Sequence, residues 1–300
     1  MIRASAPGSI MITGEHAVVY GHRAVVAAIE QRITVELAPR DDRVVTIRSS
    51  IADTLETSLD NLAEGGVYKF VLAAVALHRN ALNSGFDLSI ASEIDPTLGL
   101  GSSAAVTVAV LGALKKRLGQ DMDDVHANAL AIVRAIQGRG SGADLAASCY
   151  GGMISYRSMP SVEWAPLPNP PQLSLRYAGY KTPTSEVLQM IAARMKGSED
   201  QFDRLYAKMG DEADQAIAAA HDNDWQSFAQ SLTQYQCLMT ELGVSDGVLD
   251  QIVQDTSKEP EVLAAKISGS GLGDCVVALG ACPSGFTPAP IAQQGLVFDE

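Results

Sequence analysis

The chain has 300 residues, 47% of them hydrophobic, and carries a formal net charge of -13 at pH 7. This hydrophobic content suits a globular protein of one large or two medium domains and excludes disorder of the whole chain. The acidic balance gives no electrostatic support to a nucleic acid or an anionic membrane as a partner, and no apolar stretch resembles a membrane span or a secretory core. We therefore expect a cytoplasmic protein with no nucleic-acid or membrane partner.

The first half of the chain alternates strands and helices. β-branched content and partial alternation predict the strands, and apolar residues at helical spacing predict the helices. The polar, acidic stretch 49–66 is expected to be a loop. In chain order we predict strands at 2–6 and 9–13, a helix at 24–29, strands at 32–38 and 43–48, a helix at 67–82, a strand at 86–91, helices at 104–114 and 123–137, and a strand at 151–157.

A proline-rich segment at 159–171 separates the two halves. Its prolines lack backbone donors and discourage regular structure, so we place a boundary there, with domains at 1–165 and 166–300. Both halves are expected to be α+β. The second half predicts a strand at 173–178, helices at 184–195, 199–222, 224–242 and 246–256, and strands at 263–268 and 275–280.

A glycine-rich turn runs directly into the apolar stretch 104–114. Gly99 and Gly101 let the backbone turn tightly and approach an anion, while the N–H groups and positive dipole end of the following helix face that anion. Ser102 and Ser103 add hydroxyls that can cap the helix or reach a magnesium ion. The turn therefore predicts a phosphate site.

Two other interpretations of this turn remain open. A plain strand-to-helix connection would use glycine for geometry alone. Gly99, Gly101 and Ala104 also satisfy a loose dinucleotide-binding pattern, with Asp121 about 20 residues on, although Pro96 and the flanking order do not fit the usual βαβ setting. A phosphate-binding loop of the G-x-x-x-x-G-K-[ST] form is absent from the sequence.

Three further segments carry polar residues that suggest chemistry. A second glycine-rich loop at 268–274 has a hairpin-like turn as its alternative interpretation. Glu15 and His16 lie among apolar neighbours, where such a pair is more often a hydrogen-bonded structural feature than a catalytic one. Asp144 follows a flexible glycine-rich loop, so it either caps a helix or presents a carboxylate.

Taken together, these segments resemble the three signature motifs of the GHMP kinase superfamily, named for galactokinase, homoserine kinase, mevalonate kinase and phosphomevalonate kinase. APGSIMITGEHAVVYG at 6–21 is similar to the first motif of mevalonate kinases, and its EHAVVYG part is specific to that branch. PTLGLGSSAA at 96–105 resembles the second, phosphate-cradling motif, and KISGSGLGDC at 266–275 resembles the third. The resemblance spans nearly the whole chain.

The resemblance implies an α+β, two-domain GHMP kinase fold, with a ribosomal S5-like N-terminal domain and a ferredoxin-like C-terminal domain. It implies ATP and Mg²⁺ as cofactors, and transfer of the γ-phosphate to the hydroxyl of mevalonate in isoprenoid precursor synthesis. A homodimer is carried over by family analogy alone.

The same resemblance assigns roles to residues. Asp144 would orient or deprotonate the acceptor hydroxyl, and Ser103 would join Mg²⁺. The implied acceptor-binding residues are Glu15, His16, Lys181 and Thr184. The implied ATP-binding residues are Gly99, Gly101, Ser102, Ser103, Ala104, Gly269, Ser270 and Gly271.

Two positions depart from the family pattern. Ser9 stands where the first motif normally has a lysine that is thought to pair with the catalytic aspartate. Val133 stands, by spacing, where mevalonate kinases carry a magnesium-binding glutamate. Serine lacks the positive charge, and valine has no atom that ligates a metal.

Neighbouring sequence favours an alternative acceptor. The segment QGRGSGADLAASCYGG at 137–152 is at least as similar to phosphomevalonate kinases. A phosphorylated acceptor needs cations, for which Arg139, Lys181 and Lys266 are candidates, with an exposed, solubilising role as the alternative interpretation of each. Phosphomevalonate is therefore the second candidate acceptor, and a weakly catalytic ATP-binding homologue is a third interpretation.

Overall fold

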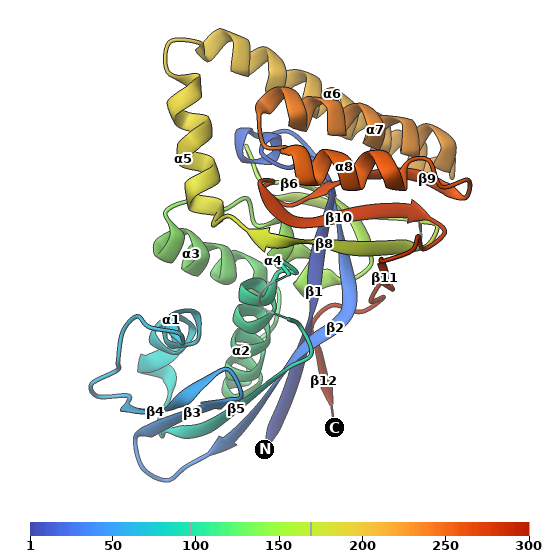
Figure 1. The fold of residues 1–300 in the computed structure, drawn as a ribbon. Helices are drawn as coiled ribbons and strands as arrows, with labels where there is room; N and C mark the ends of the chain where they lie inside the picture. Colours follow the sequence, from blue (N-terminus) through green and yellow to red (C-terminus); the bar gives the residue numbers. More distant parts are fainter. Residues whose placement is uncertain (96–97, 169, 300) are drawn as a thin grey trace.

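Two sheets form the framework of the protein in a computed structural model that describes residues 1–95, 98–168 and 170–299 (Figure 1). The strands are β1 (Ile2–Thr13), β2 (Ala24–Pro39), β3 (Val44–Ser49), β4 (Ala52–Ser58), β5 (Phe86–Ser92), β6 (Met153–Arg157), β7 (Glu163–Leu167), β8 (Leu173–Lys181), β9 (Val262–Ser268), β10 (Gly273–Gly280), β11 (Thr287–Pro288) and β12 (Val297–Asp299). The helices are α1 (Lys69–His78), α2 (Ser102–Leu118), α3 (Val125–Gln137), α4 (Ala143–Tyr150), α5 (Thr184–Met195), α6 (Glu199–His221), α7 (Trp225–Leu242) and α8 (Gly247–Thr256), with 3-10 turns η1 (Ala17–Tyr20) and η2 (Arg79–Ala81).

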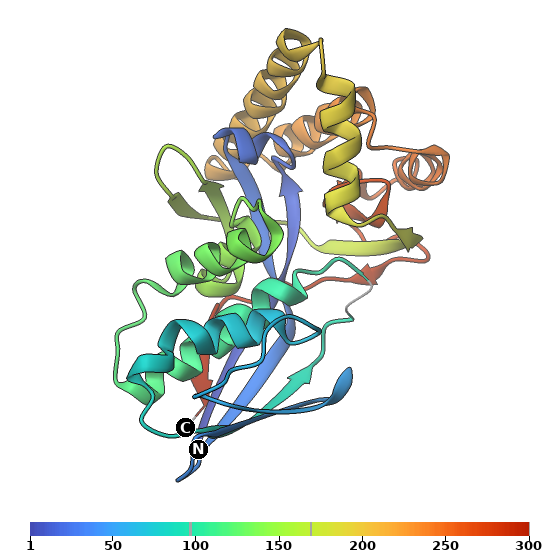
Figure 2. The ribbon, with the colours of Figure 1, turned by 90° about the vertical axis from the view of Figure 1, so that its left-hand side faces the viewer.

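The larger sheet carries the first half of the chain. Within the described residues it has eight strands in the order β12-β1-β2-β5-β3-β4, with β6 paired to β2 and β7 paired to β6. All its pairs are antiparallel except β3 with β5. Helices α2 and α4 pack on β1 and β2, and α1 and α3 pack on α2 (Figure 2). The long strands β1 and β2 extend from this sheet to the helices of the other half (Figure 1).

The smaller sheet is antiparallel, in the order β11-β8-β10-β9. Helices α7 and α8 pack on β9, and α6 packs on α7. The last strand, β12, returns to pair with β1, so residues 166–167 of β7 and 297–299 of β12 lie in the larger sheet although the sequence assigns them to the second domain. None of the helices in the described ranges is long and apolar enough to span a bilayer.

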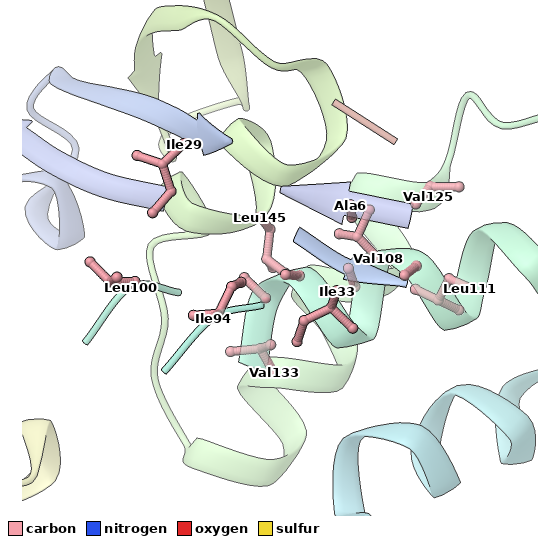
Figure 3. Packing of buried hydrophobic residues seen from close by; sticks show 14 of the residues in the cluster. Ala6, Ile29, Ile33, Ile94, Leu100, Val108, Leu111, Val125, Val133 and Leu145 are labelled. Atoms are coloured by element: carbon pink, nitrogen blue, oxygen red, sulfur yellow. The ribbon is translucent and has the colours of Figure 1, made fainter. Parts of the chain in front are cut away.

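A buried hydrophobic cluster includes a residue of the glycine turn and fixes the turn to the helices around it. Leu100 of the turn, Ile94 before it and Val108 of α2 belong to this cluster, and so do Val133 of α3 and Leu145 of α4 (Figure 3). The turn and the helices on both sides of it therefore share one core. This packing holds the start of α2 and the start of α4 in fixed relation.

Most predicted elements are confirmed, and the best case is the helix expected at 184–195, which is α5. The α+β class is also confirmed. The strands predicted at 2–6 and 9–13 are one strand, β1, with a register shift between Pro7 and Gly8. A Cβ on Gly8 would fall 2.6 Å from the Leu100 carbonyl oxygen, so the shift occurs where the turn presses on the strand.

The helix predicted at 24–29 is wrong, because these residues begin the long strand β2. All six are buried, and they pair with β1 on one side and with β6 on the other. The small side chains of Ala24 and Ala28 pack in one cluster with the alanines of α4. Burial on both sides has overridden the helix preference of alanine.

Two strands lie where the sequence predicts irregular structure. The loop expected at 49–66 contains β4, which forms a hairpin with β3. The proline-rich segment contains β7, in which Pro166 is tolerated because β7 is an edge strand that pairs with β6 alone. Edge positions make these strands hard to predict from local composition.

Candidate active site

The glycine turn lies against the middle of β1. Its described part, residues 98–101, leads into α2, and the Ser9 backbone N–H donates to the Leu100 carbonyl oxygen over 3.1 Å. Pro96 and Thr97 belong to the same predicted motif and lie outside the described residues. The turn thus meets the strand at the residue that departs from the family pattern.

Close contacts require glycine at two positions of the turn. Gly99 (φ 71°) and Gly101 (φ 68°) have left-handed backbones, which glycine adopts without steric cost. A Cβ on Gly101 would fall 2.1 Å from Ser9 Oγ, and a Cβ on Gly99 would fall 2.6 Å from Asp274 Oδ1. Ser9 and Asp274 therefore approach the turn from opposite halves of the chain.

Helix α2 begins with the predicted phosphate-binding residues. Ser102, Ser103 and Ala104 form its first turn, and Gly101 is the N-cap residue, without a side-chain cap. The Ser103 carbonyl accepts a hydrogen bond from Thr107 Oγ1 at 2.6 Å. Because no side chain caps the start of α2, and the first N–H groups of a helix have no partner within it, this end suits an anion.

Asp144 is the second residue of α4 and is held by Ser9. Ser9 Oγ donates to Asp144 Oδ1 over 2.8 Å, so strand β1 connects the carboxylate to the glycine turn. The side chain is accessible to solvent, yet the protein around it raises the pKa of Asp144 above its usual value, with desolvation as the largest cause. The Ser9 hydrogen bond and Lys181 lower this pKa, whereas Glu15 and Asp274 raise it.

Lys181 and Asp274 form an ion pair at the edge of the same site. Lys181 ends β8 and Asp274 lies in the adjacent strand β10, with Lys181 Nζ 3.0 Å from Asp274 Oδ1. A Cβ on Gly99 would fall 3.2 Å from Lys181 Nζ. The ion pair on the smaller sheet therefore lies next to Gly99 of the turn.

Glu15 and Lys266 form a buried ion pair between the two halves of the chain. Glu15 follows β1 and is 3% exposed, while Lys266 of β9 is fully buried. Their Nζ and Oε1 atoms are 2.6 Å apart. Burial lowers the pKa of Lys266, and Glu15 opposes this effect. Lys266 is thus enclosed and paired, and it has no access to an acceptor phosphate.

His16 contacts the third glycine-rich loop. Its Nε2 atom is 3.0 Å from the Ser270 carbonyl oxygen. Burial is the largest cause that lowers the pKa of His16, to about 4. The Ser270 hydrogen bond opposes this shift, and the charge of Lys266 adds to it. The imidazole is therefore neutral at pH 7. Thr184 at the start of α5 also reaches this loop, with its Oγ1 donating to Ser270 Oγ over 3.5 Å.

A small pocket opens beside His16. Tyr20 and Arg139 line it with His16, together with apolar residues of α5, among them Leu188 and Ile191. Glu15, His16 and Thr184 are therefore brought close to one loop, but Glu15 is enclosed whereas His16 borders the pocket.

The loop between β9 and β10 is packed against the C-terminal helices. A Cβ on Gly271 would fall 2.2 Å from the Val244 carbonyl oxygen, and Leu272 N–H donates to the same oxygen. A Cβ on Gly269 would instead fall 3.3 Å from Asp274 Oδ2. Gly269 thus lies on the side of the Lys181–Asp274 pair, and Gly271 lies on the side of the helix connection.

Neither Val133 nor the dinucleotide interpretation of the turn corresponds to a ligand site in the described part of the structure. Val133 is 9% exposed and lies in the core beside Ile94 (Figure 3). Among residues 1–95, 98–168 and 170–299, no three or more His, Cys, Asp or Glu side chains form a metal cluster. The dinucleotide interpretation fails because α2 leads into α3 rather than into a parallel strand, and Asp121 instead accepts from the Asp123 N–H.

Sequence reasoning missed the two contacts that unite the site, Ser9 with Asp144 and Lys181 with Asp274. Ser9 carried a signal, since it stands at the family lysine position. Asp274 carried a weaker one, because it directly follows the alternating glycines of the third loop; in the structure its backbone is left-handed (φ 62°), which is uncommon for a residue other than glycine.

Comparisons with known proteins identify the family that the chain matches. The family model of the GHMP kinases N terminal domain matches residues 67–152, and that of the GHMP kinases C terminal matches residues 216–284. The mevalonate kinase of Archaeoglobus fulgidus is 32% identical, and the match covers 99% of each chain.

Two solved structures have the same fold. The Lin0012 protein from Listeria innocua superposes with a TM-score of 0.88 at 22% identity and covers 100% of this chain and 99% of its own. The L. major mevalonate kinase in complex with R-mevalonate has a TM-score of 0.72 at 27% identity, with 93% and 87% covered. The expected two-domain fold is thereby confirmed.

Proposed function

The chain belongs to the GHMP kinases, a family of phosphotransferases, and from this premise we propose that it transfers the γ-phosphate of ATP to the hydroxyl of mevalonate. One observation carries the proposal: Ser9 joins the Asp144 carboxylate to the glycine turn, so that a proton acceptor lies beside a phosphate-binding helix start. The full-length similarity to a mevalonate kinase supports the choice of acceptor.

The glycine turn fits a nucleotide phosphate. Side chains at Gly99 and Gly101 would collide with Asp274 and Ser9, so glycine is required and the backbone of the turn is not covered by side chains at these two positions. No side chain caps the start of α2, which leaves room for an anion at its positive end. Bound ATP would supply the γ-phosphoryl group, and ADP would be the leaving group. We propose Gly99, Gly101, Ser102, Ser103 and Ala104 as its phosphate-binding residues, with Gly269, Ser270 and Gly271 of the third loop completing the nucleotide site.

A magnesium ion can bind at this site with few protein ligands. Mg²⁺ usually keeps several waters and binds phosphate oxygens with one or two protein ligands. Because Val133 lies in the core, the glutamate position of the family contributes nothing here. We propose the Ser103 hydroxyl as the protein ligand.

Asp144 would take the proton from the acceptor hydroxyl. Its raised pKa makes it a stronger base than an ordinary aspartate. The hydrogen bond from Ser9 fixes the orientation of the carboxylate. His16, whose imidazole is neutral, and the Arg139 guanidinium line a small pocket. We place an acidic, partly apolar acceptor beside this pocket, with Thr184 near it and Glu15 supporting it from within.

Phosphomevalonate is the second candidate acceptor. The observation in its favour is Arg139, an exposed guanidinium that lines the His16 pocket and suits a phosphate. We also propose that the chain divides functionally at 165/166, acts in the cytoplasm and forms a homodimer; these points rest on the sequence and on family analogy.

Coupled ADP release with Mg-ATP tests the proposal. The purified protein is given mevalonate, phosphomevalonate, galactose or homoserine, and the rate without acceptor is subtracted. Stimulation by mevalonate is expected. Stimulation by phosphomevalonate alone would make phosphomevalonate the acceptor in place of mevalonate. No ADP release above the background with any of the four, together with measurable ATP binding, would favour a weakly catalytic homologue.

A further inference from the structure

We propose that Lys181 is the cation that acts on the transferring phosphate of the nucleotide, in place of the lysine missing at position 9, and that Asp274 positions it. This inference rests on the proposed phosphotransferase function and deepens it. It places on strand β8 the positive charge that is absent at Ser9 in the first motif.

The position of Lys181 at the turn is the first argument. A Cβ on Gly99 would lie 3.2 Å from Lys181 Nζ and 2.6 Å from Asp274 Oδ1. The ammonium group therefore lies where a side chain at Gly99 would stand, close to the backbone proposed to bind the phosphates. A phosphate held at that turn would meet Lys181 with little movement of the side chain.

The availability of its charge is the second argument. The Lys181 side chain is 34% exposed, while its partner Asp274 is 8% exposed. A lysine that is only partly covered can exchange its carboxylate partner for a phosphate oxygen. Lys266, by contrast, is fully buried against Glu15 and is not available.

The charge balance at Asp144 is the third argument. Three carboxylates, from Asp144, Glu15 and Asp274, influence one another here. Among the described residues, Lys181 is the cation whose charge lowers the pKa of Asp144. Ser9, at the family lysine position, contributes a neutral hydroxyl. The acceptor oxygen that attacks and the negatively charged phosphate would thus repel each other unless Lys181 lies between them.

Direct binding to the wild type and to Lys181→Ala tests the proposal without turnover. Calorimetry with ADP and with a non-hydrolysable ATP analogue separates the last phosphate from the rest of the nucleotide. Loss of a charged hydrogen bond predicts that Lys181→Ala weakens the analogue about tenfold more than ADP. Equal weakening of both ligands, or none, would overturn the assignment.

Turnover provides the second arm. Lys181→Ala should lower kcat roughly a hundredfold and leave the acceptor KM nearly unchanged, whereas Lys181→Arg, which keeps the charge, should recover most of kcat. Asp274→Asn should lower kcat less than Lys181→Ala does. Lys258→Ala is the matched control, because Lys258 also pairs with an aspartate but is 72% exposed.

The outcomes separate this inference from the proposed function. A raised acceptor KM with unchanged kcat in Lys181→Ala would assign Lys181 to an acceptor phosphate and overturn the proposal. A wild type without activity on any acceptor would contradict the proposed function, while the ADP and analogue affinities would still decide the role of Lys181.

Discussion

Asp144→Asn removes one proton acceptor and changes the side-chain volume little. General-base catalysis contributes about 10²–10⁴-fold to a rate, so kcat should fall by that amount, while ATP affinity stays near the wild-type value because the phosphate turn is untouched. Steady-state kinetics and nucleotide titration measure both. Asp60→Asn, at an exposed ion pair with Arg43, is the control, and near-normal kcat in Asp144→Asn would remove it from the catalytic role.

The hydrogen bond from Ser9 should be visible in the pH dependence. The proposed mechanism needs the Asp144 carboxylate, so we expect kcat/KM to decline as the pH falls through its pKa, which lies above the usual aspartate value. Ser9→Ala removes an effect that lowers this pKa, and the acidic limb should therefore move to higher pH.

A pH profile of kcat/KM for wild type and Ser9→Ala checks this shift. Ser161→Ala removes a comparable serine-to-carboxylate hydrogen bond at exposed Glu163 and should leave the profile unchanged. An acidic limb that stays in place or moves to lower pH in Ser9→Ala would contradict the assigned bond.

Helix α2 offers a test of the phosphate turn with a control on the same helix. Gly101 precedes α2 and Gly119 follows it, with φ of 68° and 66°. A Cβ on Gly101 would collide with Ser9, whereas a Cβ on Gly119 meets nothing within 4 Å. Both alanine variants pay for a left-handed backbone, about 1 kcal/mol, but only Gly101→Ala displaces the turn.

We therefore expect Gly101→Ala to lose ATP affinity and Gly119→Ala to keep it. The bulkier Gly101→Val should abolish nucleotide binding. The added side chain would collide with Ser9 and so displace the turn. ATP titration of the three variants measures this, and retained affinity in Gly101→Val would reject the turn as the phosphate site.

Elements with their own local signal were predictable, and those defined by partners were not. The apolar spacing of α5 and the glycines of the turn are visible in the sequence, as is Asp144 after its loop. The helix predicted at the start of β2 is wrong because alanine favours helix locally, whereas pairing with β1 and β6 makes these residues a buried strand. Likewise, Lys181 and Asp274 are 93 residues apart in sequence, and strand pairing between β8 and β10 brings them together.

At the scale of the whole molecule, contacts between the two halves of the chain hold the site together. Ser268 Oγ donates to the Met11 carbonyl oxygen over 2.8 Å, and Tyr235 OH donates to the Glu15 carbonyl oxygen over 2.6 Å. Near them, Lys266 Nζ contacts Glu15 and lies 5.4 Å from the Tyr235 ring centroid. The third loop and the first motif are thus fixed to each other beside His16.

Lys266→Met should destabilise the protein strongly, because it leaves the Glu15 carboxylate buried without its cation. Removing one partner of a buried ion pair costs about 3–5 kcal/mol, whereas Lys258→Ala, at an exposed pair, should cost under about 1 kcal/mol. The double variant Glu15→Gln with Lys266→Met removes both charges and should regain part of the loss. Urea unfolding of the four proteins measures these differences. If Lys266→Met unfolds at the wild-type urea concentration, the pair does not hold the two halves together, and the position of the third loop must depend on the neighbouring Ser268 and Tyr235 contacts instead.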